Sequence, residues 1–303
     1  MNKGLYFYTM LRKHKIRNLT SLLLKRNGSL ILDNGFKLEF IDENKDDIIQ
    51  VFLLSIQHGA VFSPKKGFWN YEASISQIST PEGILFNIKA FDSLIFAETF
   101  IYDIHFSENL DGKFVIQAGG FIGDTALYYA SKGARVYCFE ADPNTYKCAV
   151  ANIKLNPSLS DKITMENFAI GKDEYIVFPI NEKGSGGSSV YMMNTKRTVQ
   201  VKSFSISKIL EEFKIDSPYL LDLDIKGKEF DVINESSIAK FQKVRIEYSP
   251  EYVGLKTNGR DLLINKLKDH GFKTIRIFKH NFLVYDVNYH GTIEASNPFS
   301  LEI

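Results

Sequence analysis

Cysteine and histidine are scarce in this sequence, and the few present form no recognisable site. Only two of the 303 residues are cysteines, Cys138 and Cys148, which is too few for the disulfide framework of a small secreted domain. We therefore expect a reducing compartment, namely the cytoplasm. The six histidines are scattered and show no metal-ligand spacing, so we expect no metal site.

Long apolar runs and a large net charge are also missing. The most apolar window, residues 48–62, contains two glutamines and a histidine and is too short to cross a bilayer. The first 15 residues lack the apolar run and the cleavage site of a signal peptide. The formal net charge of +1 does not draw the whole chain to nucleic acid or membranes. We expect a soluble protein.

One charged segment stands out against this balance. No acidic residue precedes Asp33, whereas seven basic residues do: Lys3, Arg12, Lys13, Lys15, Arg17, Lys25 and Arg26. A solvated helix face, a site for an anionic partner and a contact with a second subunit all fit this pattern. No platform of aromatic and basic residues accompanies the segment, so the signal for nucleic acid is weak.

Residues 1–105 predict an N-terminal α+β cap that forms the substrate region. Three elements are expected there: a helix over residues 19–24, a hairpin over residues 29–40 with an Asn-Gly turn, and a helix over residues 46–58. In the last of these helices, Ile49, Leu53 and Ile56 are spaced for one buried face. Residues 106–303 form the cofactor-binding domain in this division.

The stretch from residue 113 to residue 142 reads as strand, glycine turn, helix and strand. Gly119, Gly120 and Gly123 lie in a sequence that nearly matches G-x-G-x-x-G, with alanine in first place. Such a turn lets a ligand approach backbone N–H groups at a helix N-terminus. Glu140 follows the second strand, 20 residues after Gly120 (140 − 120), where it could grip the ribose of a nucleoside.

Strands and helices alternate in the rest of the chain, which predicts a parallel sheet with helices on both faces. A third strand is expected over residues 163–170, and the Gly/Ser-rich residues 184–189 are expected in a flexible loop or a lid. The short link between the last two expected strands, 273–278 and 282–285, requires them to be antiparallel. A nicotinamide-dependent oxidoreductase would share the glycine turn. This antiparallel ending, the acids after the fourth strand and the absence of a second substrate domain favour S-adenosylmethionine.

Several ordered blocks resemble the FkbM-type methyltransferases. Over residues 98–287 they are IGDTALYYASKGARVYCFEADPNTYKCAVANIKLN, ENFAIG, GSGGSSV, LLDLDIKGKEFDVI and RIEYSPEY. The resemblance implies a class I methyltransferase (Rossmann-like) fold, with a mostly parallel seven-stranded sheet and an antiparallel last strand. It also implies methyl transfer from S-adenosylmethionine, usually to a hydroxyl oxygen of a small molecule, sugar or lipid.

The resemblance also implies the site residues. It places Gly119 and Gly123 in the cofactor turn, Glu140 at the ribose, and Asn167, Phe168 and Ala169 near the adenine. Asp124 is expected to cap its helix or to support the methionine end of the cofactor. Asp224 is our first choice for the base that takes the acceptor proton, and Glu247 is the second.

Three positions depart from the family pattern. Gln117 stands where the first strand usually ends in aspartate, and the usual Lys and Glu of the fourth-strand motif are replaced by Asp222 and Lys226. We hypothesise that Asp222 and Lys226 form an ion pair of exchanged sign. The departures at Gln117 and Lys226 motivate an alternative function, a catalytically impaired binding or regulatory protein with the same fold.

Overall fold

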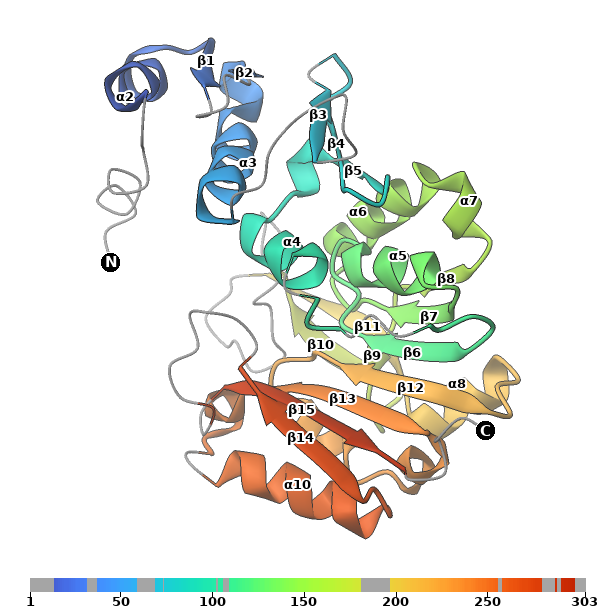
Figure 1. The fold of residues 1–303 in the computed structure, drawn as a ribbon. Helices are drawn as coiled ribbons and strands as arrows, with labels where there is room; N and C mark the ends of the chain where they lie inside the picture. Colours follow the sequence, from blue (N-terminus) through green and yellow to red (C-terminus); the bar gives the residue numbers. More distant parts are fainter. Residues whose placement is uncertain are drawn as a thin grey trace. The chain divides into compact units, whose positions relative to one another are not determined.

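The protein divides into two compact units, Met1–Ile104 and His105–Ile303 (Figure 1). The structure is a computed structural model that describes residues 14–31, 37–58, 69–72, 74–101, 103–105, 109–180, 197–255, 258–279, 287 and 290–297. No helix among these residues is long and apolar enough to cross a membrane. The role of the first unit as a substrate region stays a prediction.

The first unit combines short helices with small antiparallel sheets. Its main elements are α2 (Lys15–Leu24), β1 (Gly28–Ile31), β2 (Lys37–Phe40), α3 (Lys45–His58), β3 (Asn70–Glu72), β4 (Gln77–Ser79), β5 (Leu85–Asn87) and α4 (Ser93–Phe100). The strands β1 and β2 form the expected antiparallel hairpin, whose turn lies outside the described residues. The amide of Asn18 holds α2 to this hairpin, because it accepts from Ile31 N at 2.9 Å and donates to Ile31 O at 3.0 Å.

The helix expected over residues 46–58 is confirmed as α3, but its buried face differs from the expected one. The buried side chains are Ile48, Val51 and Phe52, whereas Ile49 is half-buried. The helix is therefore rotated by about one residue relative to the predicted stripe, which spacing alone could not distinguish in so apolar a segment. The side chains of Leu53 and Ile56 lie outside the described part of the structure.

The second unit is built on a seven-stranded sheet (Figure 1). From edge to edge the strands are β14 (Thr274–Phe278), β15 (Gly291–Ser296), β13 (Lys243–Tyr248), β12 (Pro218–Leu223), β6 (Phe114–Ala118), β7 (Arg135–Phe139) and β8 (Ile163–Glu166). Only β15 runs antiparallel to its neighbours in this sheet. The expected mostly parallel sheet with an antiparallel last strand is confirmed. The partner of β14 is β15, which the sequence did not predict, and residues 282–285 lie outside the described part.

The two faces of this sheet differ in polarity because successive side chains of a strand point to opposite sides. One face carries Ile116, Leu221 and Ile246, and these pack into the main apolar core. The other face carries Gln117, Asp222 and Arg245, which lie side by side in the strand register. The helices of this unit are α5 (Asp124–Ser131), α6 (Pro143–Lys154), α7 (Pro157–Ser160), α8 (Ile206–Glu212), α9 (Glu229–Val232) and α10 (Gly259–Asp269).

The third strand expected over residues 163–170 is interrupted in the structure. It forms β8 and then β9 (Ala169–Ile170), which belongs to a separate sheet with β10 (Tyr175–Pro179) and β11 (Thr198–Phe204). The chain leaves the main sheet at Asn167, whose Nδ2 donates to the backbone carbonyls of Glu140 and Ala141 at 2.7 and 3.1 Å. The Gly/Ser-rich residues 184–189 lie outside the described residues.

Candidate functional site

The strand order places a site at the carboxyl ends of the central strands. The chain continues from β6 to β7 on one side, whereas β12 lies beside β6 on the other. Ligands of open α/β sheets bind in the region outside the carboxyl ends of the strands at such a reversal of strand order. The loops after β6, β7, β8 and β12 carry most of the residues predicted from the sequence, and Glu247 lies near the end of β13.

The first two glycines of the turn allow close packing between neighbouring strands. Gly119 has a φ of +88°, and a Cβ there would lie 2.0 Å from the carbonyl oxygen of Asp224. A Cβ on Gly120 would lie 2.4 Å from the sulfur of Cys138. The N–H groups of both glycines donate to the carbonyl of Phe139 at 3.0 Å. The turn is therefore tied to the ends of both β7 and β12.

Glu140 joins the glycine turn to the loop that precedes α6. Its carboxylate accepts from the N–H groups of Phe121 and Asp142, both at 2.7 Å. Burial raises the pKa of Glu140 to about 7, although both backbone hydrogen bonds act in the opposite direction. Each carboxylate oxygen can accept a further hydrogen bond, so a ribose hydroxyl could bind here.

The side chains of the three consecutive residues expected near the adenine have different surroundings in the structure. Asn167 lies beside the predicted ribose acid, as its hydrogen bond to the carbonyl of Glu140 shows. The ring of Phe168 instead stacks on Phe139, with centroids 6.5 Å apart and an interplanar angle of 17°, and packs against the main core. Ala169, on β9, is buried in a small apolar cluster with Phe178 of β10 and Val201 of β11.

Gln117 and Asp124 are both buried beside the turn. The side-chain oxygen of Gln117 accepts from the sulfur of Cys138 at 3.2 Å. Asp124 begins α5 and is 1% exposed, and it accepts from the hydroxyl of Thr125 at 3.2 Å. The N-cap of α5 is Gly123, and Asp124 is the first helical residue, so the expected capping role is wrong, and its role at the methionine end of the cofactor stays a prediction. Gly123 precedes it with a φ of +81°.

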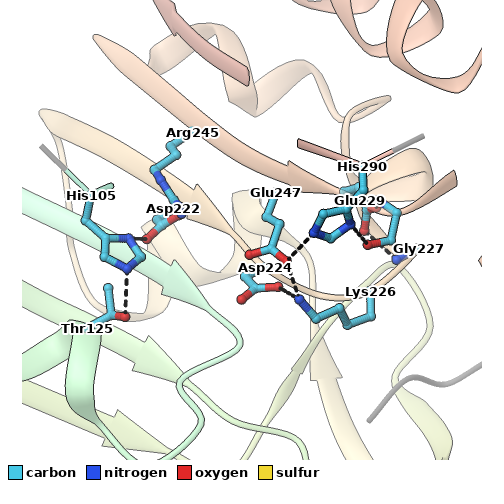
Figure 2. A network of polar contacts seen from close by, with 11 residues as sticks. His105, Thr125, Asp222, Asp224, Lys226, Gly227, Glu229, Arg245, Glu247 and His290 are labelled. Carbon is cyan, nitrogen blue, oxygen red and sulfur yellow. Dashed lines mark hydrogen bonds and ion pairs between the residues drawn. The ribbon is translucent and has the colours of Figure 1, made fainter. Parts of the chain in front are cut away.

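Two carboxylates and one ammonium group meet where β12 and β13 end (Figure 2). The Nζ of Lys226 lies 2.6 Å from Oδ1 of Asp224 and 2.5 Å from Oε1 of Glu247. The Asp224 side chain is 36% exposed, whereas that of Glu247 is 3% exposed. Burial alone would lower the pKa of Lys226, but the two carboxylates outweigh it and raise this pKa well above its usual range. The structure thus brings together both acids that the sequence predicted as bases.

His290 and Glu229 extend this cluster, and the sequence analysis missed both. Nε2 of His290 lies 3.5 Å from Oε1 of Glu247, and its Nδ1 lies 3.2 Å from the hydroxyl of Ser249. Glu229 accepts from the N–H groups of Gly227 at 2.6 Å and Ser249 at 2.9 Å, and burial raises its pKa to about 7. His290 immediately precedes the unpredicted β15, so no local signal connected it to β13.

The hypothesised ion pair between Asp222 and Lys226 is wrong. Asp222 lies in register with Arg245 on β13, and its carboxylate accepts from Nη1 of Arg245 at 2.7 Å and from the hydroxyl of Tyr129 at 2.7 Å. Of these partners, Tyr129 lies on α5 and Arg245 on β13, whereas Lys226 follows the end of β12 and lies beside Asp224 and Glu247 (Figure 2). His105 also approaches Asp222, at 3.8 Å. Among the described residues, no group of three or more His, Cys, Asp or Glu side chains is placed to hold a metal ion.

Comparisons with known proteins found a matching family model and several similar structures. A family model described as "Methyltransferase FkbM domain" matches residues 117–274, more than half of the chain. The fold is similar to that of an FkbM methyltransferase from Methylobacillus flagellatus KT, at 15% identity and a TM-score of 0.46, over 65% of this chain and 47% of the other. The matched part thus spans about half the length of that protein.

A second similar structure is the N-terminal domain of human METTL16 in complex with SAH, at 11% identity, a TM-score of 0.41 and 88% coverage of both chains. No curated protein sequence matches the chain significantly. The family model, and not these distant structural likenesses, carries the assignment. The protein belongs to the FkbM methyltransferase family.

Proposed function

We propose that the enzyme transfers the methyl group of S-adenosylmethionine to a hydroxyl oxygen, with Asp224 as the general base. The observation that carries this proposal is the contact between the cofactor turn and the base. A Cβ on Gly119 would lie 2.0 Å from the carbonyl oxygen of Asp224, so these two backbones touch. Asp224 is also the more exposed of the two acids, at 36% against 3% for Glu247.

The residues beside the turn fit the chemistry of this cofactor. Glu140 offers carboxylate oxygens that suit ribose hydroxyl groups, and the side chain of Asn167 lies beside it. The carboxylates of Asp224 after β12 and Glu247 near the end of β13 suit a cationic ligand. We assign cofactor binding to the turn and to the neighbouring loops, namely to Gln117, Gly119, Gly120, Gly123, Asp124, Glu140, Asn167, Phe168 and Ala169. Phe168 and Ala169 would contribute mainly through packing, because their side chains face apolar clusters.

The residues of the chain have two tasks in this reaction. When bound, S-adenosylmethionine supplies an electrophilic methyl group on a sulfonium. The chain has to align the acceptor oxygen with that methyl group, since alignment supplies much of the rate of such a displacement. Asp224 then takes the hydroxyl proton as the new oxygen–carbon bond forms, an effect typically worth about 10²- to 10⁴-fold.

For the acceptor we propose a small molecule, a sugar or a lipid head group, with the first unit as its binding region. The alternative of a catalytically impaired binding protein is not favoured. Of the two residues that motivated it, Gln117 is buried and hydrogen-bonds to Cys138. The other, Lys226, pairs with both proposed bases and so belongs to the site.

An Asp224→Asn variant tests the proposal. It is expected to bind S-adenosylhomocysteine in calorimetry as the wild type does, and to lose methyl transfer by about 10²-fold or more. Glu212→Gln, at an exposed position on α8, is the matched control and is expected to behave as the wild type. An Asp224→Asn enzyme with full turnover would remove Asp224 from the mechanism.

A further inference from the structure

Lys226 bridges the two carboxylates that we propose as bases. Its ammonium group lies within 2.6 Å of an oxygen of each, so Asp224 and Glu247 both border one positive charge. Two carboxylates that share a site cannot both stay ionised easily at neutral pH, because their charges repel and one of them takes a proton. The bridging charge removes this repulsion.

An unusual backbone conformation places the ammonium group of Lys226 between the two carboxylates. Lys226 has a φ of +45°, and the next residue, Gly227, has a φ of +101°. A side chain with a positive φ is uncommon and costs conformational energy, and such residues concentrate at functional sites. This strained conformation lies in the loop after β12. It directs the side chain of Lys226 back toward Asp224 and Glu247 (Figure 2).

Other charged or titratable groups act on the cluster from the surrounding elements. They are His290 before β15, Glu229 on α9, Arg245 on β13 and Glu140 after β7. The two glutamates add to the negative charge when they ionise, which increases the need for a cation in the cluster. Arg245 is itself paired with Asp222, on the face of the sheet that also carries Gln117.

We propose that Lys226 is a positioning residue that keeps Asp224 and Glu247 ionised side by side. The inference rests on the proposed function, in which a hydroxyl acceptor loses its proton to Asp224. In that step the acceptor oxygen forms a bond to the methyl carbon, the carbon–sulfur bond breaks with its electron pair going to sulfur, and the hydroxyl proton moves to the carboxylate. An Asp224 that already holds a proton cannot take this one.

The test is a pH titration of side-chain carboxyl ¹³C resonances in the full-length protein without cofactor. Asp224→Asn and Glu247→Gln assign the two resonances, because each removes one of them. Lys226→Met removes the charge and keeps most of the side-chain volume, whereas Lys226→Arg keeps the charge. Lys228→Met is the matched control, since Lys228 pairs with the well-exposed Asp231 at 2.5 Å.

In Lys226→Met, one of the two resonances is expected to titrate about one pH unit or more higher than in the wild type. Lys226→Arg and Lys228→Met are expected to titrate as the wild type does. Unchanged titration of both carboxyl groups in Lys226→Met would overturn the proposal. If the methionine variant does not fold, Lys226→Gln replaces it, because its amide can still hydrogen-bond to both acids without a charge.

This titration needs neither cofactor nor acceptor, so its result is independent of the proposed reaction. Calorimetry of the wild type with S-adenosylhomocysteine tests the cofactor instead. A shifted titration without cofactor binding would contradict the proposed function and leave the effect of Lys226 standing. Cofactor binding with an unshifted titration would contradict only the role of Lys226.

Discussion

Gly119 occupies the most crowded backbone position in the site. Its N–H donates to Phe139 at the end of β7, while the carbonyl of Asp224 fills the place that a side chain would need. Its φ of +88° is also one that residues with a Cβ rarely adopt. Only glycine meets both conditions, and this contact brings the proposed base to the cofactor turn.

A Gly119→Ala variant is expected to lose cofactor binding and more than about 3 kcal/mol of stability, because the Cβ would overlap a backbone oxygen. Gly112→Ala is the control, since Gly112 also has a positive φ but a Cβ there would meet nothing within 4 Å. That variant is expected to cost only about 1 kcal/mol. Chemical denaturation and calorimetry with S-adenosylhomocysteine measure both effects. Equal losses in the two variants would contradict the importance of the contact.

Two of the three departures from the family pattern, Gln117 and Asp222, are neighbours in the strand register. Gln117, Asp222 and Arg245 are neighbours on three adjacent strands. An aspartate at position 117 would therefore lie beside the carboxylate of Asp222, and the neutral amide avoids this like-charge contact. Asp222 is balanced by Arg245, which is fully buried.

Double-mutant cycles test this assignment of partners. Asp222→Asn and Arg245→Met are each expected to cost about 3–5 kcal/mol, because each leaves a buried charged partner. The double variant is expected to cost clearly less than the sum, with a coupling above about 1 kcal/mol. Asp222→Asn and Lys226→Met have different partners and are expected to be nearly additive. Coupling between Asp222 and Lys226, together with additivity between Asp222 and Arg245, would show instead that Asp222 pairs with Lys226.

At the scale of elements, Glu229 fastens the start of α9 to the end of β13. Its two oxygens accept from the N–H groups of Gly227 and Ser249, so one side chain connects the loops that carry Lys226 and follow Glu247. This arrangement buries the carboxyl group of Glu229, and burial raises its pKa from 4.5 to about 7.

This raised pKa predicts a pH dependence of stability. A carboxyl group whose folded pKa exceeds its unfolded pKa stabilises the fold fully below pH 4.5, and the contribution is lost as the pH rises through 7. For Glu229 the loss is about 3 kcal/mol between these limits. Urea denaturation at a series of pH values measures it. Glu229→Gln is expected to be less stable at low pH and to show a smaller loss between pH 4.5 and 7, and an unchanged slope in this variant would contradict the assignment.

Local signals in the sequence were sufficient for the elements around the glycine turn. The strand β7 and the helices α5 and α6 are bounded by Gly123, Gly133, Asp142 and Pro143, each of which has a local capping or turn role. Asp142, for example, accepts from the N–H of Asn144 at 2.8 Å, as an N-cap residue should. These elements could be predicted because residues close in sequence determine them.

The errors arose where distant residues decide the structure. The break after β8 depends on a hydrogen bond from Asn167 to Glu140, 27 residues away. The last strand, β15, contains Glu294, an unusual strand residue that Arg276 of β14 stabilises with two hydrogen bonds of 2.6 Å. Likewise, the partner of Asp222 follows from strand register, which no spacing within the β12 motif reveals.

At the scale of the whole molecule, the second unit contains every residue that we assign to the cofactor and to the reaction. The first unit carries the basic segment, of which Arg17, Lys25 and Arg26 are exposed, and Lys3, Arg12 and Lys13 lie outside the described residues. A role of this segment in binding an anionic acceptor stays a prediction. The chemistry of the acceptor is therefore best approached through the product.

The most direct test of the proposed methyl transfer to oxygen is mass spectrometry with S-adenosylmethionine that carries a deuterated methyl group. Wild-type enzyme and Asp224→Asn are incubated with a panel of hydroxyl compounds and a metabolite extract. We predict a deuterated methyl group on an oxygen of one product, with matching formation of S-adenosylhomocysteine, and loss of both in Asp224→Asn although it still binds S-adenosylhomocysteine. Label on nitrogen or carbon would contradict the proposed hydroxyl acceptor, and equal labelling by the variant would contradict the role of Asp224 as the base.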